Sequence, residues 1–246
     1  MFADNVGSMD DVISVKNLSK SIGNHQVLKN ICFSVKKGST VAIYGPNGAG
    51  KTTLFKILST LWTPTEGSVA INKFDVSTDS SNIRKSIGIL SHETFLYNDL
   101  TAEENLCFYG QMYGIDNDIL DKRIEYFLEK TGITYRATDR VSELSRGMKQ
   151  RLSIARTLIH EPQVLFLDEP YTGLDQNAVN VFENILKELD SKKTTKLIVS
   201  HNIEQSFKLC DRAIILDKGK IVFDDLKKDI SDVGSFKQTY KNLINS

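Results

Sequence analysis

The chain has 246 residues, of which 40% are hydrophobic and 25% charged, so it is long enough to bury a core and is not a disordered chain. Its 31 lysines and arginines balance 31 aspartates and glutamates, which disfavours a protein that binds nucleic acid through a basic excess. No apolar stretch reaches the ~20 residues of a membrane-spanning helix, so work at a membrane would need another chain to span it.

The beginning of the chain and its cysteines indicate a cytoplasmic protein. Residues 1–11 lack the basic and apolar segments of a secretory signal. Cys32, Cys107 and Cys210 are far apart and odd in number, which predicts a reduced chain without a disulfide framework or a zinc site.

Short apolar or β-branched runs recur along the chain and predict strands. These runs are Val12–Val15, Ile31–Val35, Thr40–Tyr44, Val69–Ile71, Ile87–Leu90, Val164–Leu167, Lys196–Val199 and Ala213–Leu216. Several are continuous apolar runs, which are typical of strands covered on both faces of a parallel sheet. Their alternation with segments of helical period predicts an α/β fold, with an antiparallel β patch near the N-terminus.

The middle of the chain has helical spacing instead. Thr101 and Glu104 form a capping box before an apolar run. Asp118–Lys130 carries an apolar stripe that Gly132 is suited to end, and Ser145–Ile159 is a third helical pattern. We therefore expect one domain over residues 1–246, with an α/β core at about 12–90 and 162–225, an inserted helical subdomain at about 91–161, and a short C-terminal tail with a helix at 226–246.

Residues 45–53 form a glycine-rich segment that matches G-x-x-x-x-G-K-[ST], between an expected strand and an expected helix. Glycines let backbone N–H groups surround phosphate oxygens, and the following helix adds its positive end. Lys51 would bind the β- and γ-phosphates, and the Thr52 hydroxyl would be a ligand for Mg²⁺. The alternative, a chance glycine turn, is disfavoured by the flanking strand and helix. The expected nucleotide-binding residues here are Gly45, Pro46, Asn47, Gly48, Ala49, Gly50, Lys51, Thr52 and Thr53.

Asp168 and Glu169 follow the expected strand Val164–Leu167. Ligands collect at the carboxyl edge of a parallel sheet. We expect Asp168 to hold Mg²⁺, directly or through water, and Glu169 to be the general base that deprotonates the attacking water. The alternative is acidic residues that only cap the next helix, and the phosphate-binding segment makes it the weaker one. The acidic pair also argues against a P-loop kinase or a switch GTPase.

Between these two motifs lies Leu144-Ser145-Arg146-Gly147-Met148. With it, the chain from about residue 12 to 225 resembles an ABC-type ATPase subunit, whose signature reads Leu-Ser-Gly-Gly-Gln. Ser145 and Gly147 match, whereas Arg146 and Met148 depart. Ser145 and the amides around Gly147 open a helix, and a helix N-terminus attracts anions. The resemblance implies a head-to-tail dimer, in which this helix end meets the γ-phosphate held by the second copy. A plain capped helix is the alternative.

The resemblance extends to two later segments. Pro170–Asp175 corresponds to the loop that touches the partner subunit. His201 follows the strand Lys196–Val199 at the family's switch-histidine position. The resemblance implies that His201 hydrogen-bonds the γ-phosphate and steadies the attacking water beside Glu169. A histidine with a purely structural role is the alternative.

Two positions depart from the family pattern. Where the family stacks an aromatic residue on adenine, this chain has Ile22, which covers the base without a π-face. We expect weaker nucleotide affinity or looser base selectivity. His92 stands where the family has a glutamine near the metal, and Mg²⁺ prefers oxygen to imidazole. We therefore expect His92 to act through water or to sense a partner. His25 and His160 belong to no constellation.

The combination of His92 with this signature resembles export-type ABC subunits that serve ABC-2-like permeases, including the ATPases of haem export in cytochrome c maturation. It implies ATP-driven export of haem or of a drug- or lipid-like compound through a separate permease, from the cytoplasmic face of the membrane. A single phosphate-binding segment then favours a homodimer, with the region from His92 to Glu104 docking a permease loop. Nucleic acid is not an expected partner.

Two further classes of function stay open at this point. A soluble ABC ATPase that drives an assembly process, such as iron–sulfur cluster scaffolding, would share every catalytic residue. A nucleotide-gated interaction module in translation or DNA repair would usually carry two ATPase halves, a long coiled coil or a basic surface, and this sequence has none of these.

Overall fold

The computed structural model describes residues 10–91 and 93–244. Within these residues the larger sheet is six-stranded, in the order β10-β9-β3-β8-β7-β6. Its strands are β3 (Thr40–Tyr44), β6 (Ile87–Leu90), β7 (Val164–Asp168), β8 (Thr195–Val199), β9 (Arg212–Asp217) and β10 (Lys220–Leu226). All neighbours pair in parallel except β9 and β10. The predicted α/β fold with a mostly parallel sheet is therefore confirmed.

A second, antiparallel sheet lies at the N-terminal side of the chain, in the order β2-β1-β4-β5. Its strands are β1 (Asp11–Ile22), β2 (His25–Lys36), β4 (Glu66–Ile71) and β5 (Phe74–Asp75). One buried cluster joins this sheet to the larger one through helix α1 (Lys51–Leu58) and contains Ile13, Leu54 and Phe166. The antiparallel patch expected from the sequence is thus confirmed, and it covers the helix that follows the phosphate-binding segment.

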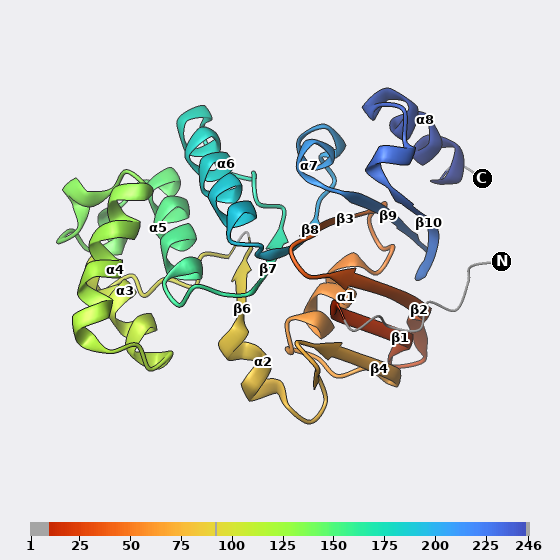
Figure 1. Ribbon diagram of the computed structural model, residues 1–246, viewed down its shortest axis with the longest axis horizontal. Coiled ribbons are helices and arrows are strands. Elements are labelled where there is room, and N and C mark those ends of the chain that lie inside the picture. Colours follow the sequence, from red (N-terminus) through yellow and green to blue (C-terminus); the bar gives the residue numbers. More distant parts are fainter. Residues whose placement is uncertain (1–9, 92, 245–246) are drawn as a thin grey trace.

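Helices make up the regular structure of residues 91–161, apart from an isolated bridge between Thr101 and Arg140. They are α3 (Ala102–Met112), α4 (Asn117–Lys130), α5 (Arg146–Leu158) and the short 3-10 turns Thr134–Arg136 and Val141–Glu143. Figure 1 shows them at one end of the molecule, with the antiparallel sheet at the other. The predicted capping box of Thr101 and Glu104 is present, with both hydrogen bonds formed. These helices therefore lie where the local signals of the sequence predicted helical structure.

The remaining helices surround the larger sheet. They are α2 (Ser80–Ser86), α6 (Gln176–Ser191), α7 (Ile203–Leu209), α8 (Val233–Ile244) and the 3-10 turn Lys227–Asp229. The sequence analysis did not identify α2, α6, α7, β5 or β10 as elements. Among the described residues, none forms a helix that is both long and apolar enough to span the hydrocarbon core of a membrane.

The end of the chain is more tightly packed than its polar composition suggests. Strand β10 continues to Leu226, past the point where the sequence becomes polar. Helix α8 then buries Phe236 completely, with its ring 5.1 Å from the rings of both Tyr44 and Phe207. The predicted C-terminal helix is confirmed, and the Phe236 ring packs it against the strand that leads into the phosphate-binding segment.

Candidate functional site

The predicted site residues follow three neighbouring strands of the larger sheet. Strand β8 lies between β3 and β7 and is parallel to both. Residues 45–53, called the phosphate loop here, follow β3, whereas Asp168 and Glu169 close β7 and Ser200 and His201 follow β8. Because parallel strands share one carboxyl edge, the fold brings these segments together, as the sequence pattern predicted.

The phosphate loop has the backbone conformation that its glycines permit. Gly50 has φ +106° and comes directly before α1, and a Cβ there would lie 2.7 Å from Leu28 Cδ2. Only glycine fits this position, for both conformational and steric reasons. The loop is also held from outside, since the Gly219 N–H donates to the Ala49 carbonyl at 3.0 Å. The turn between β9 and β10 therefore supports the loop.

Lys51 folds back over the phosphate loop. Its Nζ donates to the carbonyl of Gly45 at 2.7 Å and to that of Pro46 at 2.9 Å. Burial lowers the pKa of the Lys51 ammonium, and the negative charges of Glu169 and Asp168 act in the opposite direction. The ammonium group is thus close enough to both carboxylates to sense their charge.

Glu169 is held by the strand next to its own. Its backbone has a positive φ of +50°, and its N–H donates to the Val199 carbonyl at 2.9 Å. A non-glycine residue in this region costs free energy and persists only where its surroundings fix it. Strand β8 supplies that restraint, and the strained turn directs the Glu169 side chain toward the segment that follows β8.

Three groups from that segment contact the Glu169 carboxylate. The Ser200 hydroxyl donates to Oε2 at 3.0 Å, the His201 backbone N–H donates to Oε1 at 2.8 Å, and His201 Nδ1 lies 2.7 Å from Oε1. Ser200 is buried, and its own oxygen accepts from the Asn202 N–H at 3.0 Å. His201 is largely exposed. The carboxylate is therefore fixed in orientation, with an exposed imidazole beside it.

The signature segment joins a different loop. Ser145 caps α5 by accepting from the Met148 N–H at 3.3 Å. Asp175 caps α6 through Ala178 and also lies 3.3 Å from Arg151 NH2 of α5, and a Cβ on Gly147 would be 3.5 Å from its carboxylate. No hydrogen bond or ion pair among the described residues joins 144–148 to the phosphate loop. The start of α5 therefore packs against the 170–175 loop, and Asp175 connects the two segments.

The other predicted positions are less constrained. Ile22 ends β1 with 47% of its surface exposed. His92 lies outside the described residues, next to the buried Ser91. Thr52 and Asp168 offer hydroxyl and carboxylate oxygens, the donors that suit Mg²⁺ with several retained waters. The described residues contain no group of three or more His, Cys, Asp and Glu side chains suited to a closed metal cage.

Two features were missed by the sequence analysis. Ser200 was not singled out, although its place at the end of a buried strand, just before His201, was a usable signal. Four exposed apolar side chains also gather near α3, and the rings of Tyr97 and Phe108 are 4.9 Å apart. This apolar patch consists of Phe95, Tyr97, Phe108 and Met112. The aromatic residues of this stretch of the sequence were the available sign of it.

Comparison with known sequences gives a consistent result. The family described as "ABC transporter" matches residues 28–172. The linearmycin resistance ATP-binding protein LnrL of Bacillus subtilis (strain 168) is 36% identical over 219 residues, which cover 89% of this chain and 70% of LnrL.

Solved structures agree with the sequence comparison. An ATP-binding subunit of an ABC transporter superposes with a TM-score of 0.87 at 28% identity, over 94% of this chain and 99% of that one. The ATP-binding cassette MJ0796, a dimer in a post-hydrolysis state bound to ADP and Pi, gives a TM-score of 0.79 at 28% identity over 87% and 98% of the two chains.

Proposed function

The chain belongs to the ABC transporter family and is an ATPase, and from this premise we propose that it powers export of a small compound through a separate membrane permease. The observation that carries the mechanism is the placement of Glu169 beside the phosphate loop, with its carboxylate held by Ser200 and His201.

We propose that the phosphate loop binds the β- and γ-phosphates of ATP. Its amides and the N-terminus of α1 supply donors, and the Lys51 ammonium exchanges its two loop carbonyls for phosphate oxygens. Thr52 and Asp168 are the residues that would hold Mg²⁺, which would neutralise charge on the phosphate oxygens. Ile22 covers one face of adenine.

Glu169 would accept the proton of the water that attacks the γ-phosphate. A carboxylate whose orientation is fixed in advance loses no freedom when the water arrives, and a positioned base contributes about 10²–10⁴-fold. The exposed imidazole of His201, whose Nδ1 lies 2.7 Å from Glu169 Oε1, would donate to the γ-phosphate. Catalysis of phosphoryl transfer is mainly positioning and charge stabilisation, and these residues would supply this chain's share of both.

We propose that two copies form a head-to-tail dimer. The start of α5 has no hydrogen bond or ion pair to its own phosphate loop in the described structure, and a helix N-terminus is a site for anions. Ser145 and Gly147 would therefore contact the γ-phosphate bound by the other copy. The dimeric state of the similar cassette MJ0796 supports this arrangement.

The permease would dock on the apolar patch, at the cytoplasmic face of the membrane. Phe95, Tyr97, Phe108 and Met112 expose large apolar surfaces, and Phe108 and Met112 lie one turn apart on α3. Exposed apolar surface of this kind indicates a contact with another protein. We propose a cytoplasmic segment of the permease as its occupant. The name of LnrL refers to linearmycin resistance, which favours a drug-like cargo over haem.

Purification of the tagged full chain from gently solubilised cells tests the transporter proposal. We expect a multi-span membrane protein to co-purify with the natural chain and to be lost with Phe108→Asp. Tyr135→Asp is the matched control, because it changes an exposed aromatic side chain of the helical subdomain outside the patch. Recovery of soluble partners alone would contradict the transporter proposal and favour an assembly ATPase.

A further inference from the structure

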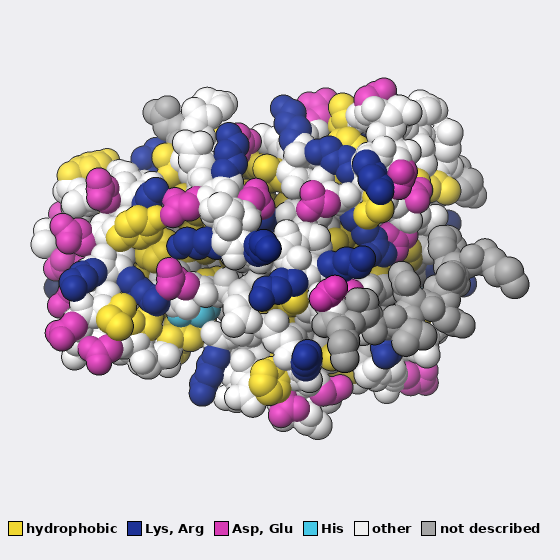
Figure 2. Space-filling view, viewed as in Figure 1, with side chains coloured by type: hydrophobic (Ala, Val, Ile, Leu, Met, Phe, Trp, Pro, Cys, Tyr) yellow, Lys and Arg dark blue, Asp and Glu magenta, His cyan; other side chains and the backbone are white. Residues whose placement is uncertain are grey.

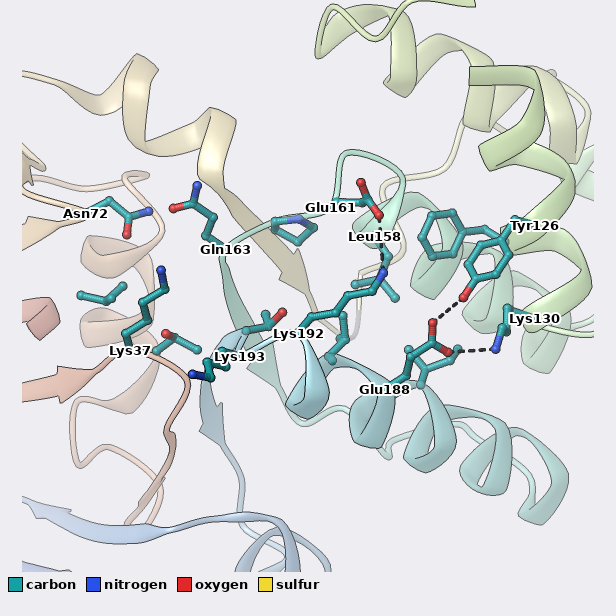
Figure 3. A pocket seen from close by; sticks show the side chains of 17 residues that line it. Lys37, Asn72, Tyr126, Lys130, Leu158, Glu161, Gln163, Glu188, Lys192 and Lys193 are labelled. Atoms are coloured by element: carbon teal, nitrogen blue, oxygen red, sulfur yellow. Dashed lines mark hydrogen bonds and ion pairs between the residues drawn. The ribbon is translucent and has the colours of Figure 1, made fainter. Parts of the chain in front are cut away.

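A cavity of about 430 Å³ lies at the opposite edge of the larger sheet from the phosphate loop. It is lined by Gln163, just before β7, and by Thr194 and Thr195, at the start of β8. The helical subdomain forms one side of it and the α/β core the other, as Figure 3 shows. Its volume is within the range of small-molecule sites. Nothing in the proposed ATPase mechanism uses this cavity.

One end of the cavity is apolar. Phe127 of α4, Leu158 of α5, and Ile185 and Leu189 of α6 line it, so that three helices contribute. Phe127, Leu158 and Ile185 are more than nine-tenths buried. This end can therefore hold an apolar body away from water.

The acidic groups at this end are already paired. Glu188 accepts from the Tyr126 hydroxyl at 2.5 Å and from Lys130 Nζ at 2.8 Å. Glu161 accepts from Arg123 NH2 at 2.6 Å and lies 3.5 Å from Lys192 Nζ. The dashed contacts in Figure 3 mark pairs from this network. Two carboxylates face three cationic side chains in this network, so it leaves no net negative charge to attract a cation.

The other end of the cavity carries unbalanced positive charge. Lys37 and Lys193 line it and form no ion pair among the residues that the structure describes. The turn after β2 packs directly on the turn after α6: a Cβ on Gly38 would lie 3.2 Å from Lys193 Cβ, and the Gly38 N–H donates to Thr195 Oγ1 at 3.0 Å. The fold thus brings the two turns that carry these lysines into contact.

Amide side chains complete the cationic end. Asn72 and Gln163 lie around Lys37 and Lys193 in Figure 3, on the side away from Tyr126 and Glu188. Figure 2 shows lysine and arginine side chains across the face drawn there, interspersed with acidic ones. The cavity is therefore polarised, with cationic and amide donors at one end and an apolar wall at the other.

We propose that this cavity binds an amphipathic organic anion. Its carboxylate, sulfonate or phosphate group would lie between Lys37 and Lys193, and its apolar body would lie against Phe127 and Leu158. Charge-assisted hydrogen bonds to two ammonium groups would fix the orientation. The ligand would contact the helical subdomain and the α/β core together, and so would hold α4 against α6.

Fluorescence titration with 8-anilinonaphthalene-1-sulfonate tests the proposal, with N-phenyl-1-naphthylamine as the neutral counterpart. Saturating ADP is present throughout, so that the nucleotide site is occupied. We expect Lys37→Gln/Lys193→Gln to weaken binding of the sulfonate at least tenfold and to leave binding of the neutral probe unchanged. Lys85→Gln/Lys122→Gln, two exposed lysines outside the cavity, should leave both probes unaffected.

A second variant and a second measurement locate the site. Leu189→Trp fills the apolar end of the cavity and should weaken the binding of both probes. Hydrogen exchange with the sulfonate bound should slow in α4 and at residues 192–195. Equal binding of the sulfonate to the natural chain and to Lys37→Gln/Lys193→Gln would overturn the proposal, as would protection confined to the phosphate loop.

Discussion

Acidification should destabilise this fold through His160, a partly buried histidine. His160 follows α5, with Nε2 2.9 Å from the Ile87 carbonyl and its ring stacked on Tyr113 at 3.7 Å. Burial lowers the pKa of His160 from 6.5 to about 4, and the nearby positive charges of Arg156 and Arg123 act in the same direction, against the hydrogen bond to Ile87. Between these two pKa values, His160 is therefore neutral in the folded chain and protonated in the unfolded chain.

The sign and size of the effect follow from this difference in pKa. Below pH 6.5 the unfolded state binds the proton and the folded state does not, so the free energy of unfolding falls as the pH falls. Relative to pH 7.5, the loss from this group is about 2 kcal/mol at pH 5 and about 3 kcal/mol at pH 4. It is complete about one pH unit below the folded-state pKa.

Urea unfolding at pH 7.5 and pH 5 measures this loss. His160→Gln retains an amide donor for the Ile87 carbonyl and cannot take up a proton, so we expect its stability to fall by about 2 kcal/mol less than that of the natural chain. His25→Gln, at an exposed histidine, controls for the loss of a histidine as such. If His160→Gln lost as much stability on acidification as the natural chain, the reasoning would be refuted.

Three other substitutions test separate parts of the account. Ser200→Ala removes one of the hydrogen bonds that hold the Glu169 carboxylate. It should lower kcat about tenfold, which corresponds to about 1.4 kcal/mol in the activation free energy, with KM for ATP unchanged. An unchanged kcat in steady-state ATPase assays would exclude the positioning role of Ser200. Phe236→Ala should cost about 3–5 kcal/mol in chemical unfolding because the ring is fully buried against Tyr44, and a loss under about 1 kcal/mol would contradict this. Ile22→Tyr should tighten nucleotide binding in a fluorescence titration, and an unchanged affinity and base preference would show that this position does not contact adenine.

Short sequence patterns correctly predicted the elements whose conformation depends on neighbouring residues in the chain. The phosphate loop, the capping box at Thr101 and the strands at Thr40–Tyr44 and Ile87–Leu90 each carry their own pattern of residue types, and each is present. The apolar runs also placed Glu169 and His201 at the ends of strands. A parallel sheet then brings those ends to one edge, so the grouping followed from the fold class.

Contacts between distant segments could not be predicted in this way. Nothing near Phe236 in the sequence shows that it packs against Tyr44, which lies almost at the other end of the chain. The hydrogen bond from Ser200 to Glu169 depends on a strained backbone turn, and the cavity joins the turns at Lys37 and Lys193. Such arrangements arise from tertiary packing, which overrides local preference and leaves no periodic pattern in the sequence.

The ATPase rate of Glu169→Gln tests the central claim most directly. Glutamine has nearly the same shape but cannot accept the proton of the attacking water, so we predict that kcat falls at least about 100-fold while ATP binding is retained. Glu129→Gln, at an exposed position on α4, should hydrolyse ATP at the natural rate. Hydrolysis by Glu169→Gln at a rate close to that of the natural chain would contradict the assignment of Glu169 as the base.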